Sequence, residues 1–220
     1  MSASAALAVP VTIDSFDDAP PVSLSVTVST PLATSLNDVP TGTLFNDRDT
    51  SLTFDAGSGS ANASLTFNDA QPSLLTLSTD TGVGASATIV YSDTGGGTRD
   101  LEAGGNNAFG FSFGVDQGFF STDPFTLSVQ IVSASGTSTV DRAFANDFIG
   151  DVFFFYDEFV GSADISTVSQ IRLILEAPNS ADAFIDTLEL TNIPVPAALP
   201  LMALGLGALV VAGRRRRDDA

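Results

Sequence analysis

Short runs of alternating apolar and polar residues fill the chain from position 9 to position 190. The first clear run is Val22-Ser-Leu-Ser-Val-Thr-Val28, in which every second residue is apolar and falls on one face. A period of two predicts strands with one buried face. The same pattern predicts further strands at 51–54, 63–67, 74–77, 85–91, 108–113, 125–132, 151–156, 171–176 and 183–190.

Turn-forming clusters separate these runs, for example at 55–59, 93–97 and 104–107. Because no amphipathic helix precedes residue 191, the pattern predicts an all-β fold, a β-sandwich of jelly-roll type, followed by a single C-terminal transmembrane helix. Positions 143–148 fit one helical turn. Asn46-Asp-Arg-Asp49 resembles the start of a calcium loop but lacks its glycine and distant glutamate, so a solvated turn is expected there.

Phenylalanine is the main core material, because the chain has 17 Phe and no Trp. Phe109, Phe111 and Phe113 lie two apart, as the buried face of one strand requires. Phe153-Phe-Phe-Tyr156 cannot turn all four rings inward by alternation. One pair of this run therefore faces away from the core, either under a second layer or as a ligand-binding platform.

The segment 191–220 has a different composition from the rest of the chain. Residues 197–213 are uncharged, and we expect them to form a helix of about 26 Å. That length is slightly short of the bilayer core, and Val195 and Pro196 would nearly close the gap. Four consecutive cations follow, and they should stay in the cytoplasm, which places the preceding chain outside. They are Arg214, Arg215, Arg216 and Arg217.

A short motif lies near the start of this segment and consists of Ile193, Pro194, Val195, Pro196 and Ala197. With this motif, the uncharged run and the arginine cluster, the tail resembles the PEP-CTERM class of sorting signals, most closely the VPLPA-CTERM variant. The resemblance implies recognition by an exosortase, a multi-pass membrane cysteine protease that cuts near the motif. Two residues differ from the variant and the Pro-Glu-Pro glutamate is absent, which leaves the particular sortase open. The alternative is an unprocessed membrane anchor.

The first eight residues fit the end of an export signal. Ala3-Ser4-Ala5 and Ala6-Leu7-Ala8 each match a small-residue cleavage site, but no basic or apolar region precedes them. We expect residues 1–8 to be the remnant of a signal-peptide c-region, with the true start upstream and the mature chain opening near Val9. The alternative is a soluble N-terminus with no signal.

Charge and composition exclude several function classes. The net charge is −18, with 26 acidic and eight basic residues, which argues against a nucleic-acid partner. Cysteine and histidine are both absent, so disulfides, thiolate or imidazole zinc sites and Ser-His or Cys-His catalytic arrangements are excluded. The chain is therefore not expected to be an enzyme.

The first and last segments of the β-rich part resemble a pair of strands that lie together in a known kind of fold. Thr12-Ile-Asp-Ser-Phe-Asp-Asp18 and Ala183-Phe-Ile-Asp-Thr-Leu-Glu-Leu190 are similar to the first and last strands of carbohydrate-binding-module-like jelly rolls. That resemblance implies that the two strands lie close together and share a structural calcium. The alternative is that these acids are ordinary turn and surface residues. The implied calcium ligands are Asp14, Asp17, Asp18 and Asp186.

Three regions follow: 1–8, the β-sandwich domain 9–190, and the sorting signal 191–220. Together they predict an exported Gram-negative protein, anchored transiently in the inner membrane and then placed at the cell surface or outside the cell. We expect a non-catalytic structural or adhesive component with an exosortase as partner. The alternative is a calcium-stabilised carbohydrate-binding module that binds extracellular polysaccharide. A hydrolase would need a catalytic carboxylate pair such as Asp157 and Glu158.

Overall fold

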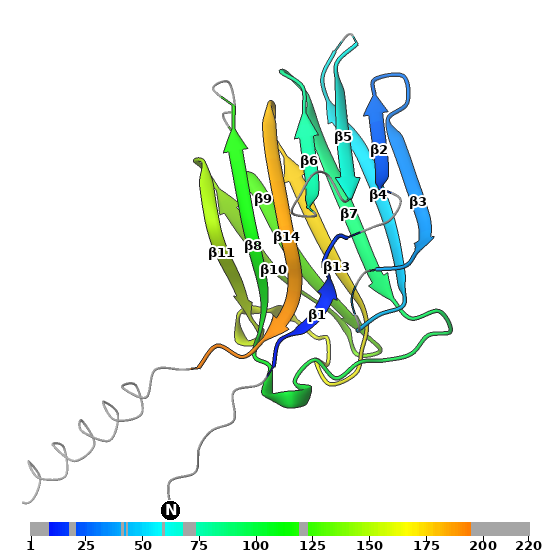
Figure 1. Ribbon diagram of the computed structural model, residues 1–220, viewed down its shortest axis with the longest axis vertical. Helices are drawn as coiled ribbons and strands as arrows, with labels where there is room; N and C mark the ends of the chain where they lie inside the picture. Colours follow the sequence, from blue (N-terminus) through cyan, green and yellow to red (C-terminus); the bar gives the residue numbers. More distant parts are fainter. Residues whose placement is uncertain are drawn as a thin grey trace, which may run out of the picture.

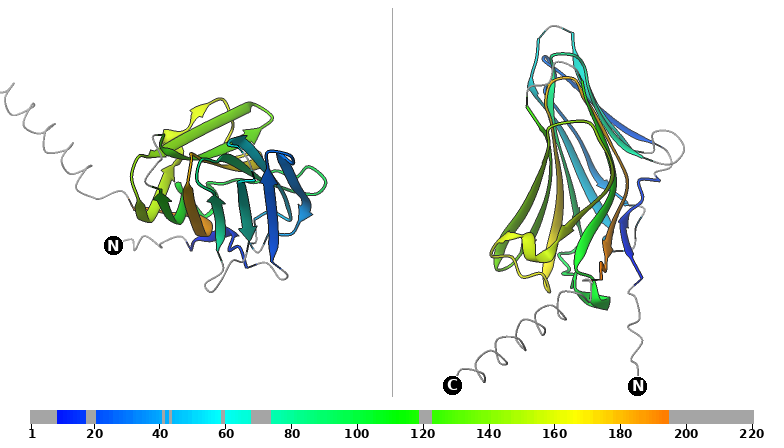
Figure 2. Two further views of the ribbon diagram at one scale, coloured as in Figure 1. Left: turned by 90° about the horizontal axis from the view of Figure 1, so that it is seen from above. Right: turned by 90° about the vertical axis from the view of Figure 1, so that its left-hand side faces the viewer.

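Two antiparallel sheets face each other in the computed structural model, which describes residues 9–17, 21–40, 42, 44–58, 60–67, 74–118 and 123–194 (Figures 1 and 2). Sheet A has the order β11-β8-β14-β6-β5-β2, with β1 beside β14. Its strands are β1 (Val11–Asp14), β2 (Val22–Thr27), β5 (Asn62–Phe67), β6 (Leu75–Thr79), β8 (Ala108–Gln117), β11 (Phe148–Phe155) and β14 (Ala181–Thr191).

Sheet B has the order β12-β10-β9-β13-β7-β4-β3. Two short 3₁₀ turns, η1 (Ala103–Gly105) and η2 (Tyr156–Glu158), connect strands at one end of the sandwich. The strands of sheet B are β3 (Leu32–Asp38), β4 (Asp47–Ala56), β7 (Gly84–Ser92), β9 (Phe125–Ser133), β10 (Gly136–Phe144), β12 (Val160–Gly161) and β13 (Val168–Ala177).

The predicted all-β sandwich is confirmed. Most strands pair with partners far away in the chain, and β7 to β8, β10 to β11 and β13 to β14 each cross from one sheet to the other, as in a jelly roll. No helix within the described residues is long and apolar enough to span a membrane. The predicted transmembrane helix, 197–213, lies outside the described residues.

Aromatic rings fill the space between the sheets. Phe109, Phe111 and Phe113 are all buried on the inner face of β8, as their spacing predicts. The ring of Phe113 lies 5.7 Å from that of Phe125 on β9 and 4.8 Å from that of Phe144 on β10. Alternation thus places a continuous aromatic layer at the centre of the fold.

The Phe153–Tyr156 run divides by alternation, as predicted. Phe154 is fully buried and contacts Phe111, whereas Phe153 and Phe155 are half-buried on the opposite face of β11. Tyr156 leaves the strand, enters η2 and donates a hydrogen bond from its hydroxyl to the Leu101 carbonyl (3.1 Å). The ring of Phe153 borders the smaller pocket on sheet A that is described below.

Two local predictions were wrong. Positions 143–148 form no helical turn: β10 ends at Phe144, a short bend follows, and β11 begins at Phe148. Asn46-Asp-Arg-Asp49 is not a solvated turn, because Asp47 begins β4 and Arg48 is completely buried in the core. Arg48 can be buried because it pairs with the buried carboxylate of Asp14, which lies too far away in the sequence for a local pattern to predict the pair.

The first and last strands are neighbours, as the resemblance implied. Val11 pairs with Leu190 and Asp14 with Leu188 in an antiparallel ladder. On that side of β14, β6 pairs with Asp182–Ile185 and β1 takes over from Leu188. A bulge at residues 186 and 187 separates these two partners, where the register with β8 also shifts.

Candidate functional site

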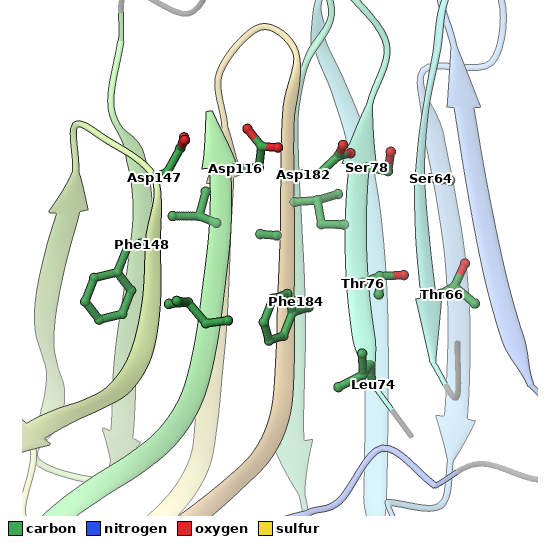
Figure 3. A pocket seen from close by; sticks show the side chains of 14 residues that line it. Ser64, Thr66, Leu74, Thr76, Ser78, Asp116, Asp147, Phe148, Asp182 and Phe184 are labelled. Atoms are coloured by element: carbon green, nitrogen blue, oxygen red, sulfur yellow. The ribbon is translucent and has the colours of Figure 1, made fainter. Parts of the chain in front are cut away.

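An open hollow of about 810 Å³ lies on the outer face of sheet A (Figure 3). It crosses β8, β14, β6 and β5, and the β10–β11 connection borders one side. Outward-facing positions of these strands supply its polar lining because their neighbours in sequence point into the core. The lining residues that carry polar groups are Ser64, Thr66, Thr76, Ser78, Asp116, Asp147 and Asp182.

Phe184 provides an aromatic ring near the centre of the hollow (Figure 3). It is half-buried, and its ring lies directly over Gly114 of the neighbouring strand β8, where any Cβ would collide with it. The bare backbone of Gly114 therefore lets the ring lie low against the sheet. Phe148 and Ile149 add apolar surface on the side of β11, and Ile149 is 79% exposed.

Three carboxylates stand side by side along one edge of the hollow (Figure 3). Asp116 on β8 lies directly opposite Asp182 on β14 in the ladder, and Asp147 precedes β11 next to Gln117. The Gln117 backbone N–H donates to Asp147 Oδ1 (2.9 Å). Ser78 of β6 continues the row, since it pairs with Asp182. The edge is thus strongly acidic and rich in hydrogen-bond acceptors.

A second, smaller pocket of about 210 Å³ lies further along the same face. Its lining includes Glu189 of β14 and Phe153 of β11, which lie opposite Gly110 on its two sides, and Asp151 of β11, which lies opposite Ser112. Burial, and then the nearby charge of Asp151, raise the pKa of the Glu189 carboxyl above its usual value. A carboxyl with a raised pKa beside a second acid is an arrangement that general acid–base chemistry uses.

The predicted calcium ligands occupy different environments. Asp14 is fully buried, and its carboxylate accepts hydrogen bonds from Arg48 (2.8 Å), Tyr91 (3.2 Å) and the Phe16 backbone N–H (3.0 Å). Arg48 also lies over the Phe67 ring, 4.0 Å from its centroid. Arg48 and Tyr91 both donate to Oδ2 of Asp14, and the Phe16 N–H donates to Oδ1.

The other three predicted ligands do not complete a metal site within the described residues. Asp186 lies in the bulge of β14, close in register to Asp14, and Asp17 is exposed. Asp18 lies outside the described residues. Among the residues that the structure describes, no group of three or more acids is arranged to hold a metal ion. The calcium site stays a prediction.

The start of the predicted sorting motif is attached to the sandwich. The Ile193 N–H donates to Asn107 Oδ1 (2.9 Å), and Asn107 Nδ2 donates to the Ile193 carbonyl (2.9 Å). Pro194 is exposed. Val195, Pro196, Ala197 and the arginines at 214–217 lie outside the described residues.

Sequence reasoning missed the hollow and its principal residues. Asp116, Asp147 and Asp182 come from three separate parts of the chain, and only the strand register brings them together. One signal was available at positions 109–114, where Phe alternates with Gly or Ser. Such a strand has one bulky face and one bare face, and a bare outer face predicts a hollow.

No family model matches the chain, and no curated protein matches it. Solved structures similar to it include a family 11 carbohydrate-binding module from Clostridium thermocellum in complex with a β-1,3-1,4-mixed-linked tetrasaccharide. That module is 12% identical with a TM-score of 0.40, over 86% of this chain and 98% of the module. The family 11 xylanase from Neocallimastix patriciarum is 9% identical with a TM-score of 0.41, over 78% of this chain and all of the enzyme. Likenesses at this level assign no function to this chain.

Proposed function

We propose that this protein is an exported, non-catalytic module that binds polysaccharide across the outer face of sheet A. The observation that carries the proposal is the hollow itself, in which the Phe184 ring packs against Gly114 beside a row of carboxylates and hydroxyls. Its volume of about 810 Å³ falls within the range of ligand sites, about 300–1,000 Å³.

Sugar chemistry matches this lining. A pyranose ring has apolar C–H faces that pack on an aromatic ring, and a rim of hydroxyls that donate to carboxylate or hydroxyl oxygens. Phe184 supplies the first kind of contact, and Asp116, Asp182 and Ser78 supply the second. Because the hollow is open and crosses several strands, a polymer chain can pass through it without a free end.

The hollow also suits display from a membrane. Asp182 and Thr191 are nine residues apart on β14, which is about 30 Å along an extended strand. The carboxylate row therefore lies at the end of sheet A far from Pro194, where the described chain ends. We propose that the tail sorts the protein through an exosortase, so that this end faces the extracellular polysaccharide. A structural or adhesive role in the matrix is compatible with the same binding face.

A hydrolase is the second candidate function, because Glu189, whose pKa is raised, shares one pocket with Asp151. Release of reducing ends from a bound polysaccharide, lost in Glu189→Gln, would favour it over the binding module. A calcium requirement remains a separate prediction, and the melting temperature with millimolar calcium tests it.

Binding of the full-length protein to a panel of soluble polysaccharides, measured by affinity electrophoresis, tests the proposal. Phe184→Ala should weaken binding by about tenfold or more, because the ring contact is lost. Gly114→Ala should weaken binding similarly, because the added Cβ displaces the Phe184 ring although the sequence keeps its phenylalanine. Ile174→Ala on the outer face of sheet B is the matched control and should bind normally. Equal binding by all four proteins, or by none to any polysaccharide, would overturn the proposal.

A further inference from the structure

Within the described residues, no basic side chain pairs with the carboxylates of the hollow. The sequence has no lysine or histidine, so arginine is the only basic side chain. Each described arginine is engaged away from the hollow: Arg48 with Asp14, Arg99 with Asp93 (2.7 Å), Arg142 with Glu158 (2.8 Å), and Arg172 with Gln130 (3.2 Å) and Gln170 (3.1 Å). None of the four described arginines therefore balances the carboxylate row, which leaves the row open to a cationic ligand.

Asp116 and Asp182 face outward on adjacent strands, about 4.8 Å apart between strand axes. Like charges placed directly opposite each other lower the stability of a sheet. Asp147 adds a third negative charge on the other side of Asp116. A cation that lies along the row would remove this repulsion, and it would do so next to the aromatic ring of Phe184.

An organic ammonium fits the row better than a metal ion. Calcium needs six to eight oxygens that converge on one point. The three carboxylates stand in a line across neighbouring strands. Among the described residues, no group of three acids is arranged around a metal position. An ammonium group needs only one or two acceptors, and a polymer that carries one on successive sugars can use a line of carboxylates.

We propose that the polysaccharide bound in this hollow carries free amino groups, whose ammonium form pairs with Asp116 and Asp182 while a sugar face packs on Phe184. This inference rests on the proposed function and narrows its ligand class. Phe184 follows Asp182 by two residues on the same face of β14, about 7 Å along the strand, so one sugar unit can contact both.

Isothermal titration calorimetry of the full-length protein with three matched oligosaccharides tests the inference. The probes are a β-1,4-linked glucosamine pentamer, its fully N-acetylated form and a β-1,4-linked glucose pentamer. The glucosamine pentamer should bind at least about tenfold more tightly than the other two, because a charge-assisted contact adds roughly 1.5 kcal/mol or more. Its affinity should fall with added salt and at a pH high enough to deprotonate the amines.

Single substitutions test whether the preference for the amine depends on the carboxylate row. Asp116→Asn and Asp182→Asn should each reduce glucosamine-pentamer affinity by about three- to tenfold, with little effect on any binding of the neutral pentamers. Asp141→Asn, exposed on the outer face of sheet B, removes the same charge elsewhere and should change nothing. An equal loss in Asp141→Asn would mean that the amine responds to the overall negative charge of the protein, and this result would overturn the inference.

Failure of this inference is distinguishable from failure of the proposed function. If the three pentamers bind equally and Phe184→Ala weakens them all, the amine requirement is wrong and the polysaccharide site stands. If calcium binds and Asp116→Asn or Asp182→Asn abolishes that binding, the row is a metal site and the amine proposal is wrong. If no pentamer binds and no longer polysaccharide does either, both proposals fail.

Discussion

The ion pair between Asp14 and Arg48 is the interaction on which single substitutions should have their largest effect. Both side chains are completely buried, and Asp14 also accepts from Tyr91 and from the Phe16 backbone. Loss of either side chain breaks a buried ion pair, which is strongly destabilising. The pair joins β1 of sheet A to β4 of sheet B, so it ties the first strand to the opposite layer.

Asp14→Ala should therefore lower the free energy of unfolding by about 3–5 kcal/mol, and Arg48→Ala by a similar amount. Asp141→Ala, an exposed acid on β10, is the control and should stay within about 0.5 kcal/mol of the parent protein. Urea denaturation followed by circular dichroism measures the difference. A loss below about 1 kcal/mol for Asp14→Ala would contradict the role assigned to the pair.

Glu189 should affect stability in a pH-dependent manner. Its pKa is raised in the folded protein, so the ionised form costs stability at neutral pH and that cost disappears as the pH falls through the folded pKa. Glu189→Gln should thus be more stable than the parent at pH 7, and the advantage should shrink toward pH 4. Unfolding free energies across this range test it. An advantage that grows as the pH falls would show that the sign is wrong.

At the scale of elements, the short strand β12 protects an edge of sheet B. Gly161 of β12 has φ +150° and packs against the Thr137 carbonyl and the Ser138 backbone, so no side chain fits there. Two residues of pairing cover part of β10, which otherwise would present free backbone groups. The pairing of β12 with β10 therefore depends on Gly161.

Gly161→Ala should displace β12 and destabilise the protein by about 1–3 kcal/mol, because it combines a strained φ with a backbone clash. Faster amide exchange at Ser138 and Thr139, and concentration-dependent association in sedimentation velocity, should accompany it. Gly84→Ala on β7 is the control, since a Cβ there meets only ordinary contacts. Unchanged exchange at β10 would contradict the protective role of β12.

Strands with a clear apolar face could be predicted from the sequence, and the others could not. All ten predicted runs fall within strands of the structure, apart from one or two terminal residues. β10 was missed because its inward positions alternate between polar and apolar residues: Ser138, Val140, Arg142 and Phe144. β3 was missed because it lies at an edge, where Leu32 is 62% exposed and no buried face produces a pattern.

The candidate site was beyond prediction for a different reason. Asp116 and Asp182 meet only because β8 and β14 are neighbours, and the pairing of strands so far apart in the chain is not encoded locally. The Phe-Gly-Phe-Ser-Phe-Gly run from Phe109 to Gly114 does encode a bare outer face. The closeness of β1 and β14 was predicted through resemblance, whereas the buried role of Asp14 was not.

At the scale of the whole molecule, an acidic sandwich precedes a tail that we propose to be a sorting signal. The described ends, Val9 and Pro194, emerge at the same end of the sandwich, because Val11 pairs with Leu190. The hollow lies toward the opposite end of β14. A protein held through its tail therefore presents the hollow away from the point of attachment.

The proposed orientation predicts that the sandwich is accessible from outside the inner membrane. With an export leader supplied upstream, protease added to spheroplasts should digest the sandwich, and changing all four arginines at 214–217 to serine should reduce its retention in the membrane fraction. A cytoplasmic protein digested only after lysis is the internal control. A sandwich that stays protected until the cells are lysed would contradict the export proposal.

The central claim is that polysaccharide binds on the outer face of sheet A, and mapping the bound surface tests it most directly. Backbone amide chemical shifts of the full-length protein should be recorded with and without a polysaccharide that it binds. We predict that the largest changes fall on residues 114–116 of β8, 182–184 of β14 and 76–78 of β6. Changes concentrated on sheet B, or at the η1 and η2 end, would contradict the account.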